Sequence, residues 1–137
     1  MFAIIIGTHG KLAEEFLTAI DMIFGEVQNT ATVTFLPGEG SADIAAKYQS
    51  ALEKLDTSNG ALFLIDIFGG TPYNAACRLV IKNEKYGIVT GISLPMIVEM
   101  ANAQMIGGDT NIRALMEKAL SVGQAGVRLF HTSMVNS

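Results

Sequence analysis

The chain has 137 residues, of which 50% are hydrophobic and 16% charged, and its formal net charge is −4. This length suits one domain, residues 1–137, with a sizeable hydrophobic core, and no apolar run is long enough to cross a bilayer. The acidic balance and the lack of a lysine- or arginine-rich cluster argue against nucleic acid as a partner and favour a basic protein partner.

The cysteine count and the amino terminus bound the cellular setting. Cys77 is the single cysteine, so no intrachain disulfide can form, and no Cys/His spacing is typical of a metal site. The first residues carry no basic segment followed by an apolar stretch and a small-residue cleavage site. We therefore expect a cytoplasmic protein that uses neither a metal nor another cofactor.

Short apolar runs alternate with amphipathic segments along the chain. β-Branched runs that stop at glycine or a turn predict buried strands, and apolar residues at helical spacing predict helices. The expected strands are 2–6, 31–36, 61–65, 87–92 and a short last one at 126–130; the expected helices are 11–24, 41–55, 73–83, 95–105 and 111–123. This alternation predicts an α/β fold with a doubly wound, mostly parallel sheet and helices on both faces.

Two polar residues follow two of these strands directly. His9 stands in Gly7-Thr8-His9-Gly10 after the first strand, and Asp66 follows the third. If the first strand lies between the second and the third, both residues reach the crevice where the winding reverses. A carboxylate beside an imidazole fixes its tautomer and leaves the other ring nitrogen free to attack an electrophile. Taken singly, a plain turn residue is the more common explanation of His9, and a helix cap or turn former is the more common explanation of Asp66.

A glycine-rich turn adds a third element. In Gly69-Gly70-Thr71-Pro72 two glycines free backbone N–H groups, Thr71 offers a hydroxyl, and Pro72 suits the first turn of a helix. Helix N-termini of this kind hold anions, although such glycines also serve purely steric needs. The turn before the first helix has similar properties. We therefore expect a phosphoryl group on His9 to be bound by Thr8, Gly10, Gly69, Gly70 and Thr71.

Several function classes lack their motifs. No Gly-x-x-x-x-Gly-Lys-Ser/Thr loop is present, and no Gly-x-Gly-x-x-Gly follows a strand, so ATP and dinucleotide binding have little support. A receiver domain needs an acidic pair after its first strand, where this chain has Thr8-His9. A serine hydrolase needs a Gly-x-Ser-x-Gly elbow, which is absent.

Four stretches together resemble the IIA component of a mannose-family sugar phosphotransferase system. They are Ile5-Ile6-Gly7-Thr8-His9-Gly10, Phe35-Leu36-Pro37-Gly38-Glu39, Leu62 through Ala76, and Gly91-Ile92-Ser93-Leu94-Pro95-Met96. The resemblance implies that His9 accepts a phosphoryl group from the carrier HPr and passes it to a histidine of the IIB component. It also implies that Asp66 supports the ring, and that Thr71, often serine in the family, binds the phosphoryl oxygens.

The resemblance also implies an assembly. The family forms homodimers in which the last strand, here residues 126–130, crosses antiparallel into the partner's sheet, and its IIB partner links it indirectly to the membrane components IIC and IID. Phe68, with Pro72 nearby, is expected to form a hydrophobic rim on which HPr and IIB dock. A Phe68 side chain folded back on the following helix is an equally open interpretation. His131 is expected to be a solvated side chain and not a second acceptor.

Two other functions fit the same residues. The phosphotransferase subunit of dihydroxyacetone kinase shares the fold and the histidine, but its turn typically reads Ser-His-Ser, whereas Thr8-His9-Gly10 favours the sugar transporter branch. A regulatory module that reports phosphorylation state is the third possibility. Neighbouring genes for IIB, IIC and IID would distinguish them.

Overall fold

A four-stranded parallel sheet organises the protein in the computed structural model, which describes residues 1–108 and 111–135. The strands lie in the order β2-β1-β3-β4. Their bounds are β1 Ala3–His9, β2 Thr30–Phe35, β3 Ala61–Ile65 and β4 Tyr86–Thr90. The helices are α1 Leu12–Ile23, α2 Ser41–Lys54, α3 Gly70–Val80, α4 Leu94–Ile106 and α5 Ile112–Ala125, followed by a 3₁₀ turn η1 at Thr132–Met134.

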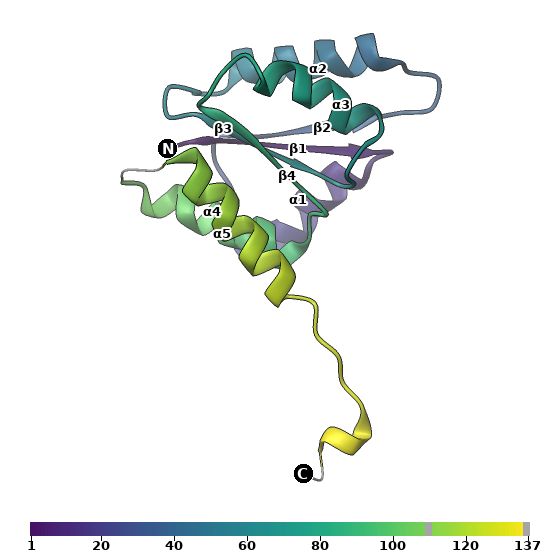
Figure 1. Cartoon of the computed structure of the whole chain (residues 1–137), viewed down its shortest axis with the longest axis vertical. Helices are drawn as coiled ribbons and strands as arrows, with labels where there is room; N and C mark the ends of the chain where they lie inside the picture. Colours follow the sequence, from purple (N-terminus) through teal and green to yellow (C-terminus); the bar gives the residue numbers. More distant parts are fainter. Residues whose placement is uncertain (109–110, 136–137) are drawn as a thin grey trace.

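The helices cover both faces of the sheet (Figure 1). α2 and α3 lie on one face, and α1, α4 and α5 lie on the other. Because successive strand residues point to opposite faces, β1 feeds two cores: Ile4 and Ile6 pack toward α1 and α4, while Ile5 packs toward α2 and α3. The continuous apolar runs of the central strands follow from this double burial. The α/β prediction with helices on both faces is confirmed.

The sheet order places the reversal of winding between β1 and β3. β1 pairs with β2 on one side and with β3 on the other, all in parallel, so the carboxyl ends of the strands meet at one edge. His9 is the last residue of β1, in register with Phe35 of β2. β1 thus runs three residues beyond the predicted strand 2–6, because pairing with β2 continues through the glycine. The predicted central position of the first strand is confirmed.

The segment after α5 differs from the prediction. Residues 127–131 form no strand within the chain and run away from the sheet (Figure 1), with Val127, Leu129 and Phe130 exposed. The sheet is therefore entirely parallel among the described residues, and the expected antiparallel strand at Gly126–Phe130 is not formed in a single copy. The physical reason is that a strand exists only through pairing, and these residues pair with no strand in the described part of the chain.

None of the helices in the described part of the chain combines the length and the hydropathy that a membrane span requires.

Candidate functional site

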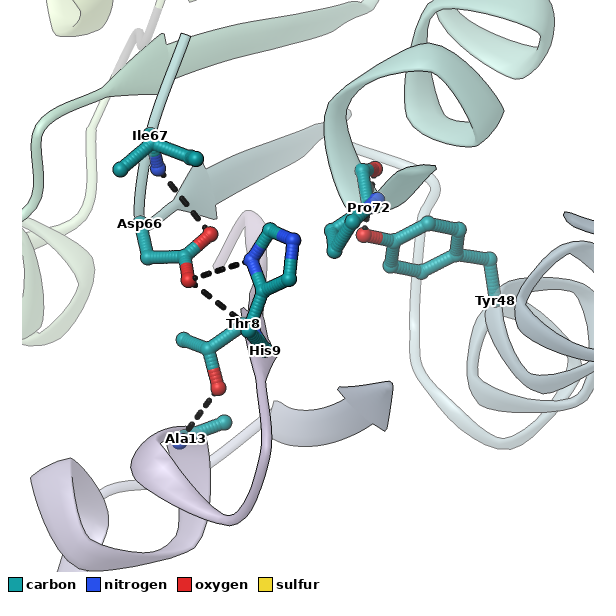
Figure 2. A network of polar contacts seen from close by, with 7 residues as sticks. All are labelled: Thr8, His9, Ala13, Tyr48, Asp66, Ile67 and Pro72. Carbon is teal, nitrogen blue, oxygen red and sulfur yellow. Dashed lines mark hydrogen bonds and ion pairs between the residues drawn. The ribbon is translucent and has the colours of Figure 1, made fainter. Parts of the chain in front are cut away.

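His9 and Asp66 meet at the carboxyl edge of the sheet (Figure 2). The His9 Nδ1 atom lies 2.9 Å from Asp66 Oδ2, and the His9 backbone N–H donates to the same oxygen, also at 2.9 Å. The other oxygen of Asp66 accepts the Ile67 N–H at 3.0 Å. Three contacts therefore fix the carboxylate. The His9 side chain is 44% exposed and that of Asp66 only 12%, so the ring faces solvent while its support is covered.

This pairing determines which ring nitrogen is available. An ionised carboxylate can only accept hydrogen bonds, so Nδ1 must carry the proton that lies between it and Oδ2. Nε2 then keeps its lone pair and has no hydrogen-bond partner within the described chain. The arrangement is that of an oriented nucleophile whose positive charge after attack is balanced by Asp66.

The turn that opens α3 packs against the free side of the ring. A Cβ added to Gly70 would lie 3.4 Å from His9 Cε1 and 3.6 Å from Nε2. Gly69 and Gly70 have φ angles of 84° and 81°, a left-handed region that favours glycine. No side chain caps this helix end. A negative group on Nε2 would therefore lie beside uncapped backbone N–H groups and the positive end of the α3 dipole.

Of the residues expected to bind phosphate, two have their polar groups engaged elsewhere. Thr8 is fully buried, and its hydroxyl accepts the Ala13 N–H at 2.7 Å, which joins β1 to the first turn of α1. The Gly10 N–H donates to the Phe35 carbonyl at 2.8 Å. Gly69, Gly70 and Thr71 lie together in the turn beside the ring. The structure thus brings only the second glycine turn against His9.

Two features of the site were missed in the sequence. The Phe35 ring meets His9 edge-on, with ring centroids 5.8 Å apart, and the alignment of their strand ends was the available signal. Glu39 fixes the turn after Phe35: its Oε1 accepts the Leu36 N–H at 2.7 Å and pairs with Lys47 Nζ at 2.8 Å. The hydrogen bond from Lys47 is the main cause that lowers the pKa of Glu39.

The two residues expected to form a docking rim lie in different environments. Phe68 is 78% exposed, and its ring also contacts Tyr73 of α3, with centroids 4.9 Å apart. It therefore faces solvent and rests on the following helix at once. Ile67 and Leu12 are exposed as well. Pro72 is buried in α3, so its ring does not belong to this surface.

Comparison with known sequences gives a consistent result. The family described as "PTS system fructose IIA component" matches residues 3–120. The mannose-specific EIIAB component of Escherichia coli K12 is 41% identical over 126 residues, which cover 92% of this chain and 38% of that protein. The fructose-specific EIIA component of Bacillus subtilis is 38% identical over 100 residues, covering 73% of this chain and 68% of its own length. The chain thus spans well under half of the EIIAB protein.

Solved structures agree with the sequence relatives. The mannose/sorbose-specific IIA subunit from Enterococcus faecalis superposes with a TM-score of 0.82 at 28% identity, covering 95% of each chain. The EIIA component from Streptococcus agalactiae superposes with a TM-score of 0.84 at 23% identity, covering 95% of this chain and 98% of that one. At that identity the second likeness speaks for the fold alone.

Proposed function

Because the chain belongs to the family of IIA components of the sugar phosphotransferase system, we propose that it carries a phosphoryl group on His9. The donor is the phosphorylated carrier HPr, and the acceptor is a histidine of a IIB component. One observation carries this proposal: Asp66 binds Nδ1 while Nε2 is left open beside the uncapped N-terminus of α3. The carrier acts as a phosphotransferase through a phosphohistidine intermediate.

The transfer step conserves the number of phosphorus–nitrogen bonds. The Nε2 lone pair of His9 attacks the phosphorus of the donor's phosphohistidine. As the new bond forms, the donor's phosphorus–nitrogen bond breaks, and its electron pair returns to the donor ring. The proton stays on Nδ1 of His9, so the phosphorylated ring is positively charged and Asp66 neutralises it. The same step in reverse order delivers the group to IIB.

The α3 turn stabilises the group in transit. In this proposal the N–H groups at Gly69, Gly70 and Thr71, in the turn whose Gly70 lies against the ring, bind the phosphoryl group on Nε2, and the Thr71 hydroxyl adds a further donor. Thr8 and Gly10 do not bind the phosphoryl group in this proposal. Their hydrogen bonds to Ala13 and Phe35 hold the end of β1 against α1 and β2. The donors of the α3 turn are in place before the reaction, so binding the phosphoryl group requires little reorganisation of the protein.

Partner proteins dock on the surface around the ring. We expect HPr and IIB to contact the apolar rim formed by Leu12, Ile67 and Phe68, all exposed next to His9 or Asp66 in the chain. Pro72 is buried in α3 and its carbonyl is bonded to Tyr48, so it takes no direct part in this rim. These partners place the reaction in the cytoplasm, with an indirect association with IIC and IID through IIB.

Two unpaired features support the proposal of a homodimer. β4 is an edge strand, and beside it α5 forms a groove of about 290 Å³ lined in part by Ile88, Met116 and Leu120. Val127, Leu129 and Phe130 are apolar and exposed. An open edge and an unpaired apolar segment are complementary, so the segment of one copy adds antiparallel to β4 of the other.

Labelling tests the proposed acceptor. The protein is incubated with phosphoenolpyruvate, enzyme I and HPr, with His131→Ala as the matched control for His9→Ala, because these are the two histidines of the chain. We expect an acid-labile, base-stable phosphate on the wild type and on His131→Ala, and none on His9→Ala. Equal labelling of His9→Ala would overturn the proposal. A subsequent chase with IIB should remove the label.

A further inference from the structure

Tyr48 is buried where three segments of the site meet, and none of its surface is exposed. It belongs to α2, and its hydroxyl donates to the Pro72 carbonyl in the first turn of α3 at 2.8 Å (Figure 2). Its ring meets Phe63 of β3 in a T-shaped contact, with centroids 5.5 Å apart. One side chain therefore joins the helix layer to the sheet directly beneath the glycine turn.

Gly7 makes room for this hydroxyl. A Cβ added to Gly7 would overlap the Tyr48 hydroxyl oxygen, although the backbone conformation of Gly7 would accept other residues. Gly7 precedes His9 by two residues on β1, and its carbonyl accepts the Asp66 N–H at 3.2 Å. The hydroxyl is thus wedged between the strand that carries His9 and the helix whose N-terminus faces it.

The Tyr48–Pro72 bond does more than satisfy a buried carbonyl. Pro72 lies inside α3, where a carbonyl in the first turn is already an acceptor of the helical hydrogen bond. The added bond therefore restrains the position of the helix end relative to β1. Burial, and next the charge of Asp66, raise the pKa of Tyr48, so the hydroxyl keeps its proton, and remains a donor, to a higher pH than that of an exposed tyrosine.

We propose that Tyr48 is a positioning residue for phosphoryl transfer, whose hydroxyl sets the spacing between His9 on β1 and the glycine turn of α3. This inference rests on the proposed transfer at His9. Small errors in that spacing weaken the donors that meet the phosphoryl group, and misplacement by an ångström costs up to about a hundredfold in rate. Because Tyr48 is fully buried, it makes no contact with HPr or IIB.

Tyr48→Phe removes the hydroxyl and keeps the ring. Tyr86→Phe is the matched control, because it makes the same chemical change in the same core layer, at the start of β4 and on the opposite edge from His9. In single-turnover transfer from phospho-HPr, we expect Tyr48→Phe to lower the saturating rate about tenfold. The half-saturating HPr concentration should stay unchanged. A loss equal to that of Tyr86→Phe contradicts the proposal.

Amide resonances provide a readout that needs no phosphorylation. Tyr48→Phe should shift the backbone resonances of Gly69, Gly70 and Thr71, and Tyr86→Phe should leave them in place. If the wild type is not phosphorylated at all, the proposed function fails while these shifts still report on the spacing. If the wild type is phosphorylated and the shifts do not move, the role of Tyr48 fails alone.

A second pair of variants tests the packing of the Tyr48 hydroxyl against Gly7. Gly7→Ala places a methyl group onto the Tyr48 hydroxyl and should slow transfer in the wild-type background. In Tyr48→Phe the overlapped oxygen is gone, and the remaining neighbours, Ile65 Cδ1 at 3.0 Å and the ring Cε1 at 3.1 Å, are side-chain atoms that can yield. The cost of Gly7→Ala should therefore be smaller there. An equal loss of transfer rate in both backgrounds would contradict the role of the contact between Gly7 and the Tyr48 hydroxyl.

Discussion

The carboxyl edge of the sheet and the segment after α5 are opposite in construction. At the edge, the hydrogen-bonding groups of Thr8, Gly10 and Asp66 all find partners within the chain. After α5, Val127, Leu129 and Phe130 lie exposed, and their backbone takes no part in the sheet. One chain therefore forms all the contacts described for His9 and Asp66, whereas the last segment forms none with the sheet. Chemistry and assembly should be separable by mutation.

Asp66→Asn should have the largest effect on phosphoryl transfer, because it changes the side chain that contacts His9 at the carboxyl edge of the sheet. The amide keeps the size of the carboxylate but has no negative charge to hold the proton on Nδ1 or to balance the phosphorylated ring. We expect transfer to slow on the order of ten- to a thousandfold with the fold retained, by comparison with other oriented bases. Rapid-quench transfer in both directions measures it. Unchanged rates would reduce Asp66 to a turn residue.

Truncation before Gly126 should separate the two regions. It removes the exposed apolar segment and leaves every contact of His9 and Asp66 in place, so phosphorylation by HPr should persist. The dimer should be lost, which yields monomer or, through the open edge of β4, aggregate. Sedimentation of both forms at micromolar concentration measures this. A stable monomer of the full-length chain would contradict the exchange, and loss of phosphorylation on truncation would contradict the separation.

Phe68→Ala should have a smaller effect, since Phe68 is exposed like the last segment yet lies beside the site. Removing the ring takes away docking area without touching the bonds between His9 and Asp66. We expect the half-saturating phospho-HPr concentration to rise by roughly five- to tenfold at an unchanged saturating rate. Ile81→Ala is the control, because Ile81 is also exposed, at the far end of α3. A fall in the saturating rate with no change in half-saturation would contradict a docking role.

The sequence was sufficient to predict which residues meet where the order of the strands alone determines their positions. His9 and Asp66 follow strands whose parallel neighbours share one edge, so their meeting follows from the sheet order and needs no side-chain detail. The glycine turn of α3 was visible for the same reason. The helix there begins at Gly70 and not at residue 73, so the N–H groups of this turn belong to the helix end itself.

The sequence was insufficient where a group has competing partners. The sequence does not show that the Thr8 hydroxyl accepts the Ala13 N–H, or that the Gly10 N–H donates to the Phe35 carbonyl. Pro72 is buried and hydrogen-bonded by Tyr48 of α2, which lies 24 residues earlier in the chain. The segment after α5 has a strand-like pattern, but the pattern cannot state whether its pairing partner is in the same chain.

The position of the phosphoryl group on the ring tests the account most directly. The protein is labelled with ¹⁵N-histidine and phosphorylated through HPr, and nitrogen–phosphorus coupling then identifies the bonded nitrogen, with His131 as an internal reference that should not change. We expect coupling to Nε2 of His9, with Nδ1 still protonated toward Asp66. Coupling to Nδ1, or a base-labile phosphate on Asp66, would contradict the account.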